Sequence, residues 1–338
     1  MGRVEIFRCD SRLLADNPLG DSATRELGVY LPDSYDRTAK RYPVIFMLSG
    51  YTGTGLALLN RQPWTQSLDQ RLDRLMASGR AAVAIVVLPD CFTRYGGSQY
   101  VDSPAIGRYE SYLCDELVPL VDSRYRTIAA SEGRGVIGKS SGGYGALRLA
   151  MRRSDTFSAL GSHAGDSAFD LSYRHELPRM LLTLEKRGGI EGFLSWFDAL
   201  TNKSQIAIEV MSNLCCAAAW SPRPTGPYGY GKGFELPFEF VTCRLREEVW
   251  ARWLAADPVR MLDERAHLEA LRRARAIYLD AGLSDEYNLQ LGTRQIAATL
   301  ARHGIAYVHE EFEGGHFNTA HRFDRSVEVV SKALATSN

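Results

Sequence analysis

The stretch Val136-Ile137-Gly138-Lys139-Ser140-Ser141-Gly142-Gly143-Tyr144-Gly145-Ala146-Leu147 decides the fold of this chain. A β-branched run leads into Ser140, which has one glycine two positions before it and another two positions after it, and a helix-like segment follows. This pattern is typical of a nucleophile elbow, where the serine is held in a strained conformation between a strand and a helix. It predicts an exposed Ser140 hydroxyl and a Ser141 N–H that points to where an oxyanion would form.

The residues from Gly133 to Ser140 also match the phosphate-loop spacing G-x-x-x-x-G-K-S. A phosphate loop needs a strand before its first glycine, but residues 126–132 make a poor buried strand. It also needs a loop between the glycines, where Val136 and Ile137 are typical of a strand. We therefore interpret the stretch as an elbow, and keep a phosphate-loop NTPase and a glycine-rich turn without function as alternatives.

The charge of the chain is balanced, since its 338 residues include 40 basic and 40 acidic side chains. This balance does not indicate a nucleic acid, another polyanion or an anionic membrane surface as a partner. A neutral or locally apolar small molecule fits better. The length suits a single α/β domain over residues 1–338 that carries an insertion.

The six cysteines form no C-x-x-C pair and no metal-ligand spacing. A chain of this length does not need disulfides for stability, so we expect reduced thiols and no metal. The amino terminus lacks the apolar segment of a secretory signal, and no apolar run approaches membrane-spanning length. We therefore expect a cytoplasmic protein without membrane insertion. The sequence leaves the oligomeric state open, including a homo-oligomer.

Apolar segments alternate with helical segments along most of the chain. Residues 25–32 alternate polar and apolar positions, which predicts an antiparallel strand at one edge of a sheet. The buried strands are predicted at 42–50, 82–88, 135–137, 157–163, 275–280 and 305–312, and the helices at 68–76, 109–121, 290–302 and 325–334. This alternation predicts an α/β protein with a mostly parallel, doubly wound sheet.

The alternation stops between Asp166 and Pro258, which we interpret as a helical and loop insertion over the carboxyl ends of the strands. The segment around 177–187 has a helical pattern, whereas 220–231 is rich in Pro and Gly and predicts a loop. The aromatic side chains of the insertion either line an apolar acyl pocket or pack the insertion onto the body. They include Phe193, Trp196, Trp220, Tyr228, Tyr230, Phe234, Phe238, Trp250 and Trp253.

A serine nucleophile needs a histidine base, and that base needs a carboxylate to orient it. His316 lies in a glycine-rich loop just after the last predicted strand, where it can reach the elbow, so we predict it as the base. His321 is the fallback. His163 follows the strand after the elbow and is placed near the site without being the base. The remaining histidines lie at helix ends, within a strand or in polar helices.

The predicted acid follows the strand at 275–280, where Asp280, Asp285 and Glu286 are the choices. Asp280 ends the strand and would point into the sheet, whereas Asp285 can reach a histidine from the next loop, so we favour Asp285. The second oxyanion donor is expected from the loop after the strand at 42–50, as the Tyr51 backbone N–H. Such a site needs no metal or cofactor.

Several blocks of the chain resemble a known group of α/β-hydrolase esterases, which includes S-formylglutathione hydrolase (esterase D), enterochelin esterase and the mycolyltransferases. The resemblance covers most of the chain and keeps the family's order, with blocks at 29–32, 43–52, 116–119, 138–147, 282–285 and 314–316. It implies an α/β-hydrolase fold with Ser140 as nucleophile, Asp285 as acid, His316 as base, and Tyr51 and Ser141 as backbone oxyanion donors.

The chain departs from S-formylglutathione hydrolase in three places. The loop at 49–53 lacks that enzyme's cysteine after the threonine, Lys139-Ser140-Ser141 stands where it has His-Ser-Met, and the insertion is longer. The sequence therefore predicts a serine carboxylesterase that acts on short- to medium-chain acyl or aryl esters. A thioesterase of the S-formylglutathione hydrolase kind or an acyltransferase is the alternative, and a non-catalytic hydrolase-fold binding protein is a more distant one.

Overall fold

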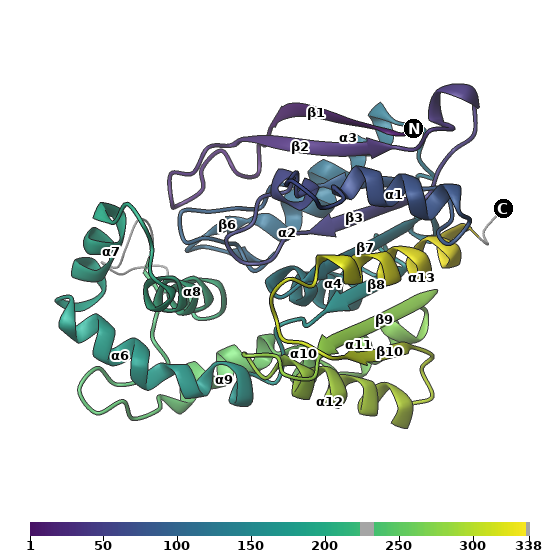
Figure 1. Ribbon diagram of the computed structural model, residues 1–338. Coiled ribbons are helices and arrows are strands. Elements are labelled where there is room, and N and C mark those ends of the chain that lie inside the picture. Colours follow the sequence, from purple (N-terminus) through teal and green to yellow (C-terminus); the bar gives the residue numbers. More distant parts are fainter. Residues whose placement is uncertain (224–232, 336–338) are drawn as a thin grey trace.

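The computed structural model describes residues 1–223 and 233–335. Within them, eight strands form one sheet in the order β1-β2-β4-β3-β7-β8-β9-β10 (Figure 1). The first two pairings, β1 with β2 and β2 with β4, are antiparallel, and all the others are parallel. The strands are β1 (Arg3–Asp10), β2 (Thr24–Leu31), β3 (Val44–Leu48), β4 (Ile85–Leu88), β7 (Arg134–Lys139), β8 (Ala159–His163), β9 (Ala276–Gly282) and β10 (Val308–Phe312). A small hairpin joins β5 (Asp102–Ser103) to β6 (Gly107–Arg108).

Helices cover both faces of the sheet (Figure 1). One face carries α1 (Leu68–Ala77) and α13 (Phe323–Ala335), and the other carries α3 (Val118–Arg124), α4 (Ser141–Arg152), α11 (Arg265–Arg272) and α12 (Leu289–Arg302). The residues of β3 divide between the two cores: Phe46 packs with the α4 face and Met47 with the α1 face, and both are buried. Burial on both faces explains why this strand is a continuous apolar run in the sequence.

The prediction that residues 25–32 lie at the edge of the sheet is wrong. The segment at 25–32 does form an antiparallel strand, β2, but β2 lies between β1 and β4, so the edge is β1. Residues 3–10 were not predicted as a strand because their sequence, RVEIFRCD, mixes charged and apolar residues. None of these residues is fully buried, since an edge strand needs no continuous apolar run.

The predicted helix at 109–121 is present, but it is interrupted. A short α2 (Tyr109–Ser111) leads into a π-helical turn (Tyr112–Leu117), and α3 follows with Pro119 at its start. The Val118 N–H bonds back five residues to Leu113. Proline has no N–H to continue an α-helical ladder, so the wider turn lies where that ladder is broken.

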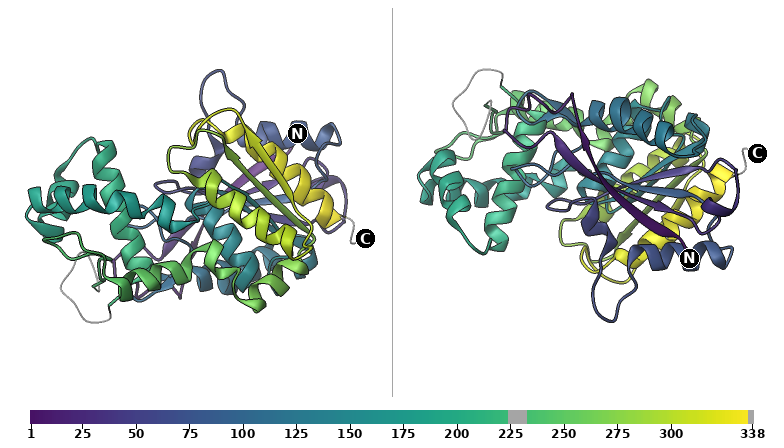
Figure 2. Two further views of the ribbon diagram at one scale, coloured as in Figure 1. Left: turned by 90° about the horizontal axis from the view of Figure 1, so that it is seen from below. Right: turned by 90° about the horizontal axis from the view of Figure 1, so that it is seen from above.

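The segment between β8 and α11 contains six α-helices among the described residues, besides a 3-10 turn at Arg174–Glu176. They are α5 (Phe169–Ser172), α6 (Leu177–Lys186), α7 (Gly189–Ala199), α8 (Gln205–Trp220), α9 (Glu247–Ala256) and α10 (Pro258–Met261). Figures 1 and 2 show α6, α7 and α8 projecting to one side of the sheet layers. Residues 224–232 of the predicted loop, with Tyr228 and Tyr230, lie outside the described residues.

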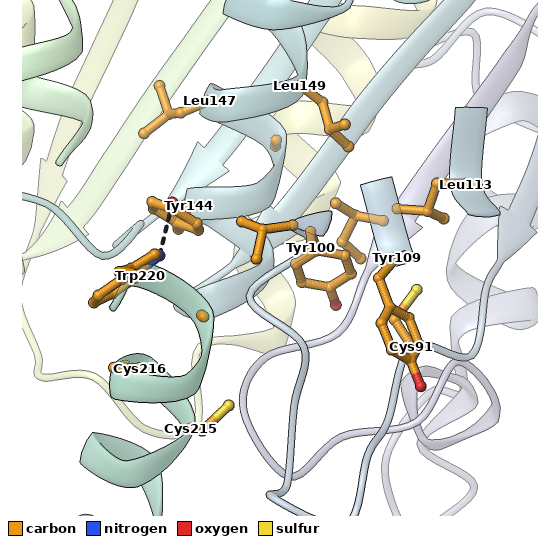
Figure 3. Close-up of a cluster of buried hydrophobic side chains, with 14 of the residues drawn as sticks. Cys91, Tyr100, Tyr109, Leu113, Tyr144, Leu147, Leu149, Cys215, Cys216 and Trp220 are labelled. Atoms are coloured by element: carbon orange, nitrogen blue, oxygen red, sulfur yellow. Dashed lines mark hydrogen bonds between the residues drawn. The ribbon is translucent and has the colours of Figure 1, made fainter. Parts of the chain in front are cut away.

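The aromatic side chains of this segment pack with one another and against the body. Trp220 stacks on Phe169 with ring centroids 4.5 Å apart. The ring centroids of Trp220 and Trp253 are 5.2 Å apart. The Trp220 indole donates a hydrogen bond of 3.1 Å to the Tyr144 hydroxyl, so α8 is joined to α4 (Figure 3). The rings of Phe169, Trp220 and Trp253 therefore pack the segment onto the body.

One carboxylate joins the two ends of the segment between Asp166 and Pro258. Asp257 is buried and accepts backbone N–H bonds from Ala168 at 2.9 Å, Phe169 at 2.8 Å and Val259 at 2.9 Å. It also caps the amino terminus of α10. The point where the chain leaves β8 and the point where it returns to the body are thus held side by side.

A buried polar cluster lies between the sheet and α13. His163 Nδ1 pairs with Asp280 at 2.7 Å, and His163 Nε2 lies 2.7 Å from the Ser326 hydroxyl. The other Asp280 oxygen accepts 2.8 Å hydrogen bonds from Tyr278 and Arg322. Burial raises the pKa of Asp280, but His163 and the hydrogen bonds around it lower the pKa more, and the net pKa is below its usual value. His163 was predicted near the active site; its backbone carbonyl does accept the Ser140 N–H at 2.9 Å, but its ring is enclosed in this cluster and does not line the site.

The Asp280→Asn variant is expected to lose about 1.5–3 kcal/mol of unfolding free energy at neutral pH, since the hydrogen bonds of Tyr278 and Arg322 lose their charged acceptor, although Arg322 keeps its ion pair with Glu310. A carboxylate whose pKa is lowered by folding adds stability above its unfolded pKa, and this stability is lost as pH falls through the folded value. The difference between wild type and variant should therefore narrow below about pH 4. Urea unfolding followed by circular dichroism at several pH values measures it.

The exposed ion pair of Asp36 with Arg3 offers a matched control. Asp36→Asn should change stability by less than about 1 kcal/mol, because solvent screens exposed pairs. If Asp280→Asn lowers the unfolding free energy no more than this control does, the buried cluster is not a source of stability.

No described helix combines the length and apolarity needed to cross a membrane. The six cysteines are unpaired thiols.

Candidate active site

Ser140 stands at the turn between β7 and α4 with φ 57° and ψ −126°. Residues with side chains rarely adopt this conformation, and it is the strained turn that the elbow interpretation predicts. The turn is fixed by a 2.9 Å hydrogen bond from the Ser140 N–H to the His163 carbonyl. Because Val136 and Ile137 lie within β7, they form a strand and not a loop, which contradicts the phosphate-loop alternative.

Gly138 and Gly142 let strand and helix pass closely. A Cβ on Gly138 would lie 2.2 Å from the Gly142 carbonyl oxygen, and a Cβ on Gly142 would lie 2.5 Å from the carbonyl oxygen of Leu48. No side chain fits at either position without moving backbone. The glycine spacing of the motif therefore has a steric cause.

The loop that follows β3 lies against Ser140. A Cβ added to Gly50 would lie 3.5 Å from the Ser140 Cβ. The Tyr51 hydroxyl donates a 2.6 Å bond to the Tyr95 carbonyl, which anchors the loop, and among the described residues the Tyr51 N–H has no hydrogen-bond acceptor. The Ser141 N–H is in the first turn of α4, where N–H groups have no acceptor within the helix. Their role as oxyanion donors stays a prediction.

His316 is hydrogen-bonded to Asp285, with 2.8 Å between His316 Nδ1 and Asp285 Oδ2, and both residues are buried. The second Asp285 oxygen accepts backbone bonds from Tyr287 at 3.0 Å and Leu289 at 3.4 Å. These contacts hold the carboxylate in place. The Nδ1 of His316 then carries the proton that the carboxylate accepts, which leaves Nε2 as the basic nitrogen.

The two loops that carry this pair are joined to each other. The Ser284 N–H donates a 2.9 Å bond to the Gly314 carbonyl, and Glu286 accepts the His316 N–H at 2.5 Å. Of the acid candidates, Asp285 contacts the imidazole, Glu286 contacts the histidine backbone and Asp280 belongs to the buried cluster beside α13. His321 lies in the turn before α13.

A cavity of about 500 Å³ opens in front of Ser140 and His316. Its wall on the body combines the apolar side chains of Met47, Ala57, Leu58, Leu68 and Phe323 with polar ones such as Thr52, Asn60, Arg71 and Lys139. Its wall on the segment between β8 and α11 is largely polar, with Asp166, Ser172, Tyr173, Glu176, Gln205, Glu209 and Ser212. The insertion aromatics for which lining and packing were left as alternatives do not line the cavity where the structure describes them, and the rings that do are Tyr51, Tyr173, Tyr287, Phe317 and Phe323.

The sequence did not predict Asp166 as a site residue, yet it contacts Ser140. Among the described residues, the Ser140 hydroxyl is hydrogen-bonded to Asp166 Oδ1, at 3.5 Å, and not to His316. Asp166 follows β8, the neighbour of β7, and the carboxyl ends of neighbouring parallel strands meet at one edge of a sheet. That position was the available signal, but a single aspartate after a strand forms no recognisable motif.

Burial changes the proton affinity of three groups in the cavity. It raises the pKa of Asp166 to about 6 and the pKa of Glu176 to about 7. It lowers the pKa of Lys139, which lies above the Phe317 ring at 5.8 Å. Asp166 therefore changes charge just below neutral pH, close to the predicted nucleophile.

Known proteins resemble this chain in sequence and in structure. The model of the family described as "Putative esterase" matches residues 22–326. The protein named Esterase Rv1288, from Mycobacterium tuberculosis strain H37Rv, is 29% identical over 171 residues, which cover 49% of this chain and 33% of that protein. The chain thus matches a third of the length of this curated relative.

Solved structures share the fold over nearly the whole chain. A ferulic acid esterase has a TM-score of 0.61 at 20% identity, and the match covers 98% of this chain and 99% of the other. An S-formylglutathione hydrolase from Agrobacterium tumefaciens has a TM-score of 0.58 at 15% identity, with 97% and 96% covered. The predicted α/β-hydrolase fold is confirmed.

Proposed function

Since this chain belongs to the family described as "Putative esterase", we propose that it is a serine carboxylesterase that hydrolyses short- to medium-chain acyl or aryl esters. The observation that carries the proposal is the joint placement of Ser140 on a strained elbow and of the Asp285–His316 pair at one cavity. A nucleophile, a base and an orienting carboxylate are the groups that acyl transfer requires.

In the proposed first step, His316 removes the Ser140 proton while the hydroxyl oxygen attacks the ester carbonyl carbon. The N–H groups of Tyr51 and Ser141 hold the oxyanion that forms. Asp285 stabilises the imidazolium, which then gives its proton to the departing alcohol, and an acyl-enzyme remains.

Water completes the cycle in the second step. His316 takes a proton from the water as its oxygen attacks the acyl carbon, and it returns this proton to the Ser140 oxygen as the carboxylic acid leaves. Another acceptor in place of water would make the protein an acyltransferase.

A series of p-nitrophenyl esters tests the proposal. We expect kcat/KM to rise from the acetate to the butyrate, because each methylene buried against the apolar side chains of the cavity is worth about 0.8 kcal/mol, or about fourfold. The rise should stop when the chain is longer than the cavity, so the palmitate should gain nothing further.

A fluorophosphonate probe separates the alternatives. Covalent labelling of Ser140 without turnover of any ester would favour a different acyl substrate, for which S-formylglutathione is the thioester to test. A protein that neither reacts with the probe nor hydrolyses an ester is a binding scaffold, and the proposal is then wrong.

A further inference from the structure

Asp166 is held against the predicted nucleophile by contacts on three sides. Its Oδ1 lies 3.5 Å from the Ser140 hydroxyl, and its Oδ2 accepts a 2.7 Å bond from the Tyr173 hydroxyl. Its backbone N–H donates to the Ser140 carbonyl at 3.4 Å. The residue is 6% exposed, and that exposed part faces the cavity.

When Ser140 is acylated, Asp166 Oδ1 loses its hydrogen-bond donor, the Ser140 hydroxyl. In the proposed mechanism the Ser140 proton passes to His316 and then to the departing alcohol, so the acylated oxygen has no hydrogen to donate. Tyr173 is already bonded to Oδ2, and a neutral His316 must accept a proton from water. A buried carboxylate oxygen without a donor is costly, and a donor on the substrate removes that cost.

We propose that Asp166 is a specificity-determining residue, which accepts a hydrogen bond from a hydroxyl or ammonium group that the substrate carries close to its scissile ester. The proposal rests on the proposed function, since it takes Ser140 as the nucleophile. It deepens that function by naming a chemical feature of the substrate.

The shape and polarity of the cavity agree with this role. Beyond Asp166 its wall continues with hydroxyl, amide and carboxylate groups, whereas the apolar side chains of Met47, Ala57, Leu58, Leu68 and Phe323 lie on the body. A substrate with one apolar part and one part rich in hydrogen-bond donors matches both walls. With a pKa of about 6, Asp166 is mostly ionised at neutral pH, when it is the stronger acceptor.

Two pairs of esters test the proposal, and in each pair a hydroxyl replaces a methyl of the same size. p-Nitrophenyl lactate is compared with p-nitrophenyl isobutyrate for a donor on the acyl side, and 2-hydroxyethyl butyrate with propyl butyrate for a donor on the alcohol side. The measured quantity is the ratio of kcat/KM within each pair. Comparison of this ratio between wild type and variant cancels the intrinsic reactivity of the esters.

Asp166→Asn is expected to lower the ratio by about tenfold in at least one pair, because hydrogen bonds to a charged group are worth more than neutral ones. Asp263→Asn, at an exposed carboxylate outside the cavity, should keep the wild-type ratios. Near-ultraviolet circular dichroism and labelling by the fluorophosphonate probe show whether each variant is folded.

The pH dependence of the kcat/KM ratio within each ester pair is a second measurement, which would not change if Asp166 had only a structural role. The ratio should rise with pH as Asp166 ionises around pH 6, and Tyr173→Phe should move the rise to higher pH, since the Tyr173 hydroxyl lowers the Asp166 pKa. Protonation of His316 affects both esters of a pair and cancels. The titratable groups that interact with Asp166 are Tyr144, Tyr173, Glu176, Cys215, Cys216, Asp285 and His316.

Unchanged ratios in both pairs for Asp166→Asn would overturn the proposal, and so would an equal slowing of all four esters. These outcomes leave the esterase proposal standing. Failure of that proposal looks different, because the wild-type protein would then hydrolyse none of the four esters and would not react with the probe.

Discussion

Replacement of Ser140 by alanine is expected to lower kcat for p-nitrophenyl butyrate by on the order of 10⁶, because no other group can form the acyl-enzyme. The variant should fold normally. Alanine fits the space of the serine, and the backbone bonds of the turn, from Ser140 N–H to His163 and from Tyr144 N–H to Ser140, do not involve the hydroxyl. Steady-state kinetics and thermal melting measure the two effects.

Ser141→Ala is the matched control, since it removes a hydroxyl one residue away. Only the backbone N–H of Ser141 is predicted to act, so this variant should stay within about tenfold of wild type. Burst kinetics add a second check: the wild type should release p-nitrophenol in a burst where deacylation is slow, and Ser140→Ala should show none. Full activity of Ser140→Ala would exclude the proposed mechanism.

Asp285→Asn is expected to lower kcat by about 10⁴. The amide would face His316 Nδ1 with a similar shape but without charge, so it would neither fix the tautomer nor stabilise the imidazolium. The loss should appear in kcat with little change in KM, because Asp285 contacts the histidine and not the cavity. Kinetics over a range of pH measure it.

Glu286→Gln tests whether support of the loop that carries His316 matters separately from the orientation of the His316 ring by Asp285. Glu286 accepts the His316 backbone N–H, which a glutamine oxygen can also accept, so we expect a loss of less than about tenfold. Comparable losses in both variants would mean that the carboxylates act on the loop as a unit, and that Asp285 has no separate role.

The parts of the fold that the sequence predicted are those with a local physical cause. β3 is buried on both faces and is therefore a continuous apolar run, and the glycines around Ser140 are required by backbone packing at distances that exclude a Cβ. β1 was missed because an edge strand can alternate charged and apolar residues without a continuous apolar run. The insertion aromatics were ambiguous, since a ring that lines a cavity and a ring that packs a helix have the same sequence signal.

The site was predictable to a similar degree. His316 and Asp285 follow successive strands and carry a recognisable order along the chain, so their hydrogen bond could be expected. Asp166 had no such pattern around it, and its contact with Ser140 depends on two strands being neighbours in the sheet. That adjacency is a property of the folded topology. The Asp285–His316 pair also joins two strand ends, but it follows a recognisable order along the chain, whereas the contact of Asp166 with Ser140 required the structure.

The hydrogen bonds of Asp257 mark a junction at which the segment between β8 and α10 can be exchanged for another. Because this carboxylate holds the departure and return points of the chain together, the segment between them can lengthen, shorten or be replaced without stretching the body. Mutation and recombination there would alter the polar wall of the cavity and leave β7, the elbow and the Asp285–His316 pair in place. A chimera joined at this junction should keep its hydrolytic machinery while it acquires the substrate range of the donor segment, so selectivity and chemistry can evolve at separate rates.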